Sequence, residues 1–160
     1  MAAVLLAACS APARVPFGQA TGERVSSVVT RVPDTQAHDV EVAEYVLRST
    51  PASADGSPLL RMVLIADHGE WQQNVFGYAE QESPAGRRHF YRVFGRLYRD
   101  TLAARPTAKF QLTATYVRSV GSDWQRPRGL GYHVVFHMDV DEQTGRVVAG
   151  SPHIQAAANP

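Results

Sequence analysis

The chain has 160 residues and a net charge of +1, and its 44% hydrophobic and 19% charged residues are typical of globular proteins. This length suits one domain with its own core. The near-neutral charge argues against a nucleic-acid-binding protein, because such domains are usually strongly basic. The single cysteine, Cys9, excludes an internal disulfide and a cysteine-based zinc site. No apolar stretch approaches the roughly 20 residues that a membrane-spanning helix needs.

The cysteine directly follows an apolar run, residues 2–8. The motif Leu6-Ala7-Ala8-Cys9 resembles the lipobox of bacterial lipoproteins, in which the cysteine becomes the lipidated first residue of the mature chain. The leader is short and lacks the basic residues of a secretory signal, which favours a start upstream of Met1. The alternative is a short buried segment that happens to contain a cysteine.

The resemblance implies a signal peptide over residues 1–8, a lipid such as palmitate on Cys9, and a lipidated tether over residues 9–23. Ser10 follows the cysteine, where aspartate often signals inner-membrane retention in enteric members of the family. The resemblance therefore implies an anchor at the periplasmic face of the outer membrane, in the bacterial cell envelope. The Ala, Pro and Gly content of the tether fits a flexible linker.

The first half of the remaining chain combines predicted strands with one ambiguous segment. β-Branched residues over 24–32 predict a strand. Val40, Ala43 and Leu47 share one face of a helix, so we expect a helix from about Asp39 to residue 50, although a strand is the alternative.

A loop rich in Pro, Gly and Ser follows over residues 51–58. The continuous apolar run 59–66 predicts a strand that is buried on both faces. Residues 67–70 form a turn, and 71–80 are a plausible partner strand. These residues therefore predict a pair of neighbouring strands.

Residues 87–104 show a helical pattern that ends before Pro106. The apolar residues that would share one face are Phe90, Val93, Phe94, Leu97, Thr101 and Leu102. The arginines that would line another face are Arg88, Arg92, Arg96 and Arg99. We expect an amphipathic helix whose apolar stripe covers a sheet.

The second half of the chain alternates clearly between apolar and polar residues. Both 109–117 and 132–140 have the period of two that is typical of half-buried strands. Residues 141–145 predict a hairpin turn with Gly145 in the left-handed conformation, and 146–150 return as a strand. We expect a frayed tail over 151–160.

These elements predict an α+β fold over residues 24–150. We expect a two-layer sandwich in which one or two helices cover an antiparallel sheet of about four to six strands. The helix over 87–104 is the natural cover for the apolar faces of the strands at 109–117 and 132–140.

Two groups of residues are candidates for binding a partner. The loop 119–131 is longer than a tight hairpin requires, and Trp124 between Arg126 and Arg128 has the composition of an interaction hot spot. The arginines of the predicted helix suit carboxylates and phosphates, which guanidinium groups bind in a bidentate manner. The alternatives are a tryptophan that caps the core and a solvated helix face.

Two groups of residues are candidates for catalysis. Asp67, His68 and Glu70 lie at a turn after a strand, where a histidine beside carboxylates could act as a general base. His137 and Asp139 share the polar face of a predicted strand with His133. On a strand, His133 and His137 are about 13 Å apart, so they cannot share a metal ion without ligands from other strands.

No nucleophile motif or phosphate-binding glycine loop accompanies these groups, and a turn or solvated sheet face is the alternative for each. We therefore expect a non-enzymatic envelope lipoprotein that binds a protein partner or an anionic envelope component and assists assembly or transport. The alternative is a lipid-anchored periplasmic hydrolase that acts on cell-wall or lipid material. We expect no metal, cofactor or nucleic acid.

Overall fold

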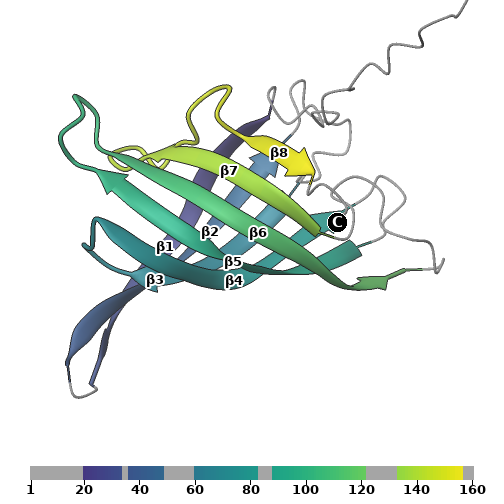
Figure 1. Ribbon diagram of the computed structural model, residues 1–160, viewed down its shortest axis with the longest axis horizontal. Coiled ribbons are helices and arrows are strands. Elements are labelled where there is room, and N and C mark those ends of the chain that lie inside the picture. The colour runs from purple at the N-terminus through teal and green to yellow at the C-terminus, as the bar shows by residue number, and fades with distance from the viewer. Residues whose placement is uncertain (1–19, 34–35, 49–59, 83–87, 122–132, 157–160) are drawn as a thin grey trace, which may run out of the picture.

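The computed structural model describes residues 20–33, 36–48, 60–82, 88–121 and 133–156, and every regular element in them is a β-strand (Figure 1). The strands are β1 (Thr21–Val32), β2 (His38–Arg48), β3 (Leu60–Asp67), β4 (Gln72–Glu82), β5 (Arg88–Asp100), β6 (Thr107–Val120), β7 (His133–Asp141) and β8 (His153–Ala156). They form one eight-stranded sheet in which neighbours in the chain are neighbours in space. Every pairing is antiparallel.

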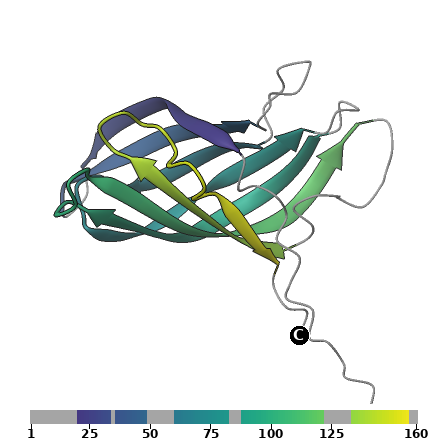
Figure 2. The same ribbon diagram turned by 90° about the horizontal axis from the view of Figure 1, so that it is seen from above.

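The sheet curls until β1 meets the hairpin that follows β7 (Figure 2). The N–H of Arg24 donates to the carbonyl of Gly145 at 2.7 Å, and the N–H of Val147 donates to the carbonyl of Gly22 at 2.9 Å. The same arm of the hairpin also bridges to β7, where Val147 pairs with Val140. The arm therefore joins β1 to β7 and satisfies backbone groups that an open edge would expose.

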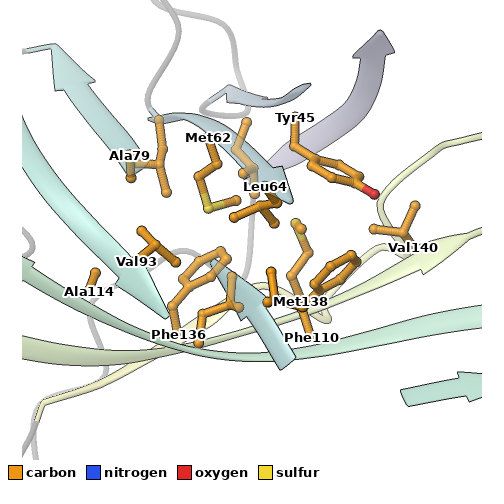
Figure 3. Packing of buried hydrophobic residues seen from close by; sticks show 14 of the residues in the cluster. Tyr45, Met62, Leu64, Ala79, Val93, Phe110, Ala114, Phe136, Met138 and Val140 are labelled. Carbon is orange, nitrogen blue, oxygen red and sulfur yellow. The ribbon is translucent and has the colours of Figure 1, made fainter. Parts of the chain in front are cut away.

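The core lies inside this curled sheet, so the expected α+β sandwich is wrong. No helix occurs in the described residues, and the inner face of the sheet is buried by its own opposite side. Figure 3 shows side chains from distant strands pointing into one space. Tyr45 of β2 meets Phe110 of β6 edge to face, with ring centroids 5.4 Å apart. Such aromatic pairs stabilise a core beyond the area that they bury.

Side chains fill the middle of the core. The gap bordered by Leu60, Met62, Val93 and Phe136 measures only about 10 Å³, no more than the roughly 10–15 Å³ that a single water molecule needs. Each fully buried aliphatic side chain stabilises the fold by roughly 1.5–3 kcal/mol. The sheet therefore obtains its core without a covering helix, and this part of its interior has no space for a ligand.

The helix predicted over 87–104 is a strand, β5. The prediction used apolar residues three and four apart, but β5 buries Val93 and Leu97 and exposes Phe94, and the spacing of the arginines did not distinguish the two structures. Residues four apart share a face both in a helix and in a strand, so Arg88, Arg92 and Arg96 line one side in either case. In the structure these three arginines point outward, while Tyr91 and Leu97 are buried inside the sheet. Phe90 and Phe94, which a helix would bury, instead share the outer face with the arginines.

Two other predictions of the first half need correction. The segment predicted as a helix from Asp39 is β2, where the alternate residues Ala43, Tyr45 and Leu47 are buried. The strand at 59–66 exists as β3, but it is buried on one face only, since Ile65 is exposed on the other.

The strands predicted at 24–32, 71–80, 109–117 and 132–140 are confirmed as β1, β4, β6 and β7. The hairpin turn is confirmed too, because Gly145 has a φ of 70°.

Both ends of the fold extend beyond the boundaries expected for it. β1 begins at Thr21, within the predicted tether. His153–Ala156 form β8, in the segment that we expected to be a frayed tail.

Two glycines on the inner face mark where neighbouring strands approach most closely. A Cβ atom at Gly77 would lie 1.9 Å from the carbonyl oxygen of Val63, and one at Gly95 would lie 2.1 Å from that of Gln111. Both contacts are with backbone, which cannot move aside as a flexible side chain would. Glycine in a strand interior is typical of a tight bend, so these positions allow the sheet to curl.

We expect Gly77→Ala to lower the free energy of unfolding by about 3 kcal/mol or more, because the added methyl group forces β3 away from β4. Gly69→Ala is the control, since a Cβ there meets nothing within 4 Å and only the positive φ of 86° opposes it. We expect this control to cost about 1 kcal/mol. Urea denaturation of both variants measures the difference, and equal costs would contradict the role of Gly77.

Candidate binding surface

Three aromatic side chains stand on the outer face of β4 and β5. Phe76, Tyr78 and Phe94 are 55%, 54% and 57% exposed. Phe76 and Phe94 are register partners, and their ring centroids are 6.2 Å apart. Aromatic rings are the side chains that a soluble domain gains most by burying, so three rings left half in water form an unusual surface.

Two of the predicted arginines flank this aromatic pair. Arg92 lies opposite Tyr78, and Arg96 lies opposite Asn74. Within the described residues neither arginine has an ion pair or a hydrogen-bond partner. We call Phe76, Tyr78, Arg92, Phe94 and Arg96 the aromatic–arginine surface.

The third predicted arginine of this face, Arg88, is less available. Its guanidinium lies 3.4 Å from Glu80, and it also sits 5.9 Å from the ring centroid of Phe90. Arg118 of β6 approaches the same ring at 5.4 Å. Arg88 therefore belongs to a neighbouring cluster in which its charge is already matched.

Apolar side chains extend from the aromatic–arginine surface across the first strands. Ile65 pairs with Phe76, Val42 pairs with Ile65, and Val28 pairs with Val42. All of these side chains are exposed. Cross-strand partners have Cβ atoms about 4.5–5.5 Å apart, so the row is continuous. Continuous exposed apolar surface in a soluble domain is typical of an interaction site.

The fourth predicted arginine, Arg99, lies on the other side of the sheet. It is an odd number of residues from Arg96, so in a strand it points inward, and its side chain is only 10% exposed. Its guanidinium donates to Glu41 at 3.1 Å and also binds the carboxylate of Glu142. Arg99 therefore links β2, β5 and the turn after β7, and it has a structural role.

The catalytic group predicted at Asp67, His68 and Glu70 is not assembled. The Nδ1 of His68 lies 3.3 Å from the carboxylate of Glu41 on β2, whereas Asp67 pairs with His38 at 3.4 Å. No contact joins the Glu70 carboxylate to His68 within the described residues. The histidine is therefore oriented by a carboxylate that the sequence pattern did not single out.

Ser27, Glu41 and His68 are not connected in the way that a catalytic triad requires. The hydroxyl of Ser27 donates to the carboxylate of Glu41 at 2.7 Å and not to the imidazole of His68. A serine nucleophile must contact the imidazole that takes its proton. The His68 side chain is 47% exposed, so solvent water can reach the imidazole, and no hydroxyl or thiol of the described residues contacts it.

Glu41 is the buried charge at this end of the sheet. Burial raises the pKa of its carboxyl group, but hydrogen bonds from Ser27 and His68 and the nearby Arg99 guanidinium outweigh burial and hold the pKa below 4.5. The charged form is therefore stabilised by folding. Its contribution to stability is present above the unfolded-state pKa and is lost as the pH falls through the folded-state pKa.

We expect Glu41→Gln to lower the free energy of unfolding by about 2–3 kcal/mol at pH 7, because Arg99 then loses one of its two carboxylates in a buried site. The difference from the wild type should shrink as the pH falls below the unfolded-state pKa, because the carboxyl group binds a proton in the unfolded chain first and in the folded chain only at a lower pH.

Glu80→Gln is the matched control, because its pair with Arg88 is at the surface and contributes only about 0–1 kcal/mol. Denaturant titrations at pH 7 and pH 3.5 measure both variants. An equal loss in the two variants, or a loss in Glu41→Gln that does not depend on pH, would contradict the assignment.

The other predicted catalytic residues, His137 and Asp139, lie on the outer face of β7. The imidazole of His137 stacks on that of His153 in β8, with centroids 4.5 Å apart and ring planes 6° apart. His133 contacts the hydroxyl of Thr115 instead. No group of three metal-binding side chains surrounds one point in the described part of the chain.

Several predicted residues lie outside the described residues. They are Cys9, Trp124, Arg126 and Arg128. The aromatic members of the surface, Phe76 and Tyr78, were missed, although the sequence carried a signal for them. In residues 71–80 they alternate with Val75, Gly77 and Ala79, so the strand is apolar on both faces. A sheet that buries only one face must then expose aromatic rings.

No protein family matches this chain, and neither a curated protein nor a solved structure is significantly similar to it. In the described residues, no helix has the length and apolar character that crossing a bilayer requires.

Proposed function

We propose that this protein is a non-enzymatic binding module of the bacterial cell envelope, anchored by a lipid on Cys9, and that its aromatic–arginine surface docks a protein partner. The observation that carries the proposal is the in-register pair Phe76–Phe94, exposed between two arginines that have no partner in the described residues. Arginine beside aromatic residues is the composition of interaction hot spots.

The close packing of the core favours a binding site on the outside of the sheet. The gap in the middle of the core is about 10 Å³, whereas pockets for small molecules measure about 300–1,000 Å³. A carrier that encloses its ligand there is therefore disfavoured. The outer face of the sheet is the part of the described chain where unsatisfied charge and exposed apolar area coincide.

The spacing of the surface specifies the chemistry of the partner. Arg92 and Arg96 lie four residues apart on one strand, which places their Cα atoms about 13 Å apart. The Phe76–Phe94 pair lies between them. A complementary segment presents two carboxylates about 13 Å apart with apolar side chains between them. An extended acidic peptide with carboxylates four residues apart has this pattern.

A lipid anchor favours such a binding role. An anchored domain meets envelope partners at a raised effective concentration, so a surface of moderate affinity is sufficient. Stable anchoring takes more than one acyl chain, since each buried CH₂ group contributes about 0.8 kcal/mol.

The hydrolase alternative has one favourable contact, the carboxylate-oriented imidazole of His68. Among the described residues no nucleophilic side chain contacts this imidazole, and neither Asp67 nor Glu70 contacts it. The binding role therefore ranks first.

We expect the protein, expressed in a bacterium from its natural gene, to incorporate labelled palmitate, and Cys9→Ser to abolish the label and release the protein from the membrane fraction. The reason is that the lipid is attached to the sulfur of the cysteine, which serine lacks. Fluorography and membrane fractionation measure the two effects. An unlabelled wild-type protein would refute the anchor but leave the docking surface untouched.

We expect a photo-crosslinking residue at position 78 to form a discrete adduct in intact cells, and the double variant Arg92→Ala/Arg96→Ala to reduce its yield about tenfold or more. The same residue at position 30, on the exposed hairpin of β1 and β2, is the position control. Arg31→Ala is the charge control, because its exposed pair with Asp39 lies far along the sheet.

Both arginine variants should keep the wild-type melting temperature, since exposed side chains contribute little to stability. Immunoblotting of the adduct and thermal denaturation measure these outcomes. An adduct that survives the double variant, or one that forms equally at position 30, would contradict docking at this surface.

A further inference from the structure

Two histidines that are distant in the chain, His137 and His153, lie side by side on the outer face of β7 and β8. His137 and His153 are register partners on adjacent antiparallel strands. Their rings are 4.5 Å apart and within 6° of parallel. β8 therefore supplies a histidine beside His137, whereas His133 lies about 13 Å away along the same strand as His137.

The hydrogen bond of His153 determines which of its nitrogens is available. Its Nδ1 lies 2.9 Å from the carbonyl oxygen of Ser151. A carbonyl only accepts, so Nδ1 carries the hydrogen, and in the neutral ring Nε2 keeps its lone pair. Metal-binding histidines typically donate their second nitrogen to a backbone carbonyl or carboxylate in this way, which fixes the tautomer and the ring orientation.

His137 is also suited to bind a cation. Within the described residues it has no hydrogen bond or ion pair. Across β6, its register partner is the uncharged Gln111.

We propose that His137 and His153 together bind a divalent transition-metal ion of the class that prefers imidazole, such as Zn²⁺, Cu²⁺ or Ni²⁺. No third histidine, cysteine or carboxylate completes a cluster in the described residues. Water or a group from a partner therefore fills the remaining coordination positions, as in sites that keep open positions.

The register pairing of His137 with His153 is what places the two imidazoles within reach of one ion. Two nitrogens that each bind one ion at about 2.0–2.1 Å are at most about 4.2 Å apart. The rings are parallel with their centroids 4.5 Å apart. Because an ion lies in the plane of each imidazole that binds it, both side chains rotate on binding so that their ring planes converge on the ion.

Binding would also hold β8 in place. β8 has only four residues, and β7 is its pairing partner in the sheet. An ion shared by the two strands links them directly. A metal that binds the folded state and not the unfolded one raises stability with its concentration. This inference is independent of the proposed docking function, because the two sites share no residue.

The test uses the untagged full chain, titrated with Zn²⁺ and Ni²⁺ at pH 7.5 and followed by calorimetry and by thermal denaturation. We expect one ion per chain and a rise in melting temperature. His137→Ala and His153→Ala should each weaken binding about tenfold or more, because one of two protein ligands is lost. His133→Ala is the matched control, since it removes a histidine from the same strand and face.

Cu²⁺ electron paramagnetic resonance gives a readout that does not depend on the stability of the variants. The wild-type spectrum should show coupling to two nitrogens, and each single variant should show one. His137→Asn and His153→Asn, which keep a polar side chain, should behave like the alanine variants while retaining the wild-type circular dichroism spectrum. Wild-type affinity in the double variant His137→Ala/His153→Ala, or fewer than two nitrogens in the wild-type spectrum, would overturn the proposal.

Discussion

Because no helix covers the sheet in the described chain, the inner face of the sheet must be buried by the far side of the same sheet. This constraint requires strong curvature, which Gly77 and Gly95 permit through close backbone contacts. It also requires that the sheet closes on itself, which the hairpin arm at Gly145–Val147 achieves by linking β7 to β1. Loss of either feature would expose the core to water.

The same constraint determines what the outer face can be. Once one side of every strand faces the core, the alternate residues face solvent, whatever their chemistry. On β1, β2 and β3 they include Val28, Val42 and Ile65. On β4 and β5 they include Phe76, Tyr78 and Phe94. Rings that the core does not use are the basis of the docking proposal, and Arg92 and Arg96, which have no partner in the described residues, would add specificity for an anionic partner.

Polar residues occupy one end of the interior and connect distant parts of the chain. Glu41 and Arg99 lie on β2 and β5, and Glu142 follows β7. Buried charges of this kind stabilise a fold only when they are paired. The ion pairs therefore specify how these strands meet at that end of the sheet. His68 contacts the same carboxylate from the β3–β4 turn, and its position follows from this pairing.

Several local features could be predicted from the sequence alone. The alternation in 109–117 and 132–140 predicted β6 and β7, and the turn before Arg146 was correctly predicted with a left-handed Gly145. These features depend on neighbours in the chain, so local patterns report them directly. The lipobox-like motif at Cys9 is equally local and stays a prediction.

The tertiary structure alone decided the identity of β5 and the partners of its residues. Arginines spaced by four fit both a helix and a strand, and the choice between them depends on pairing with β4 and β6. The same holds for Arg99, which turned inward to Glu41, and for His153, which met His137. Such contacts join residues that are distant in the chain. They form only when the whole sheet closes, and periodicity within one segment carries no information about them.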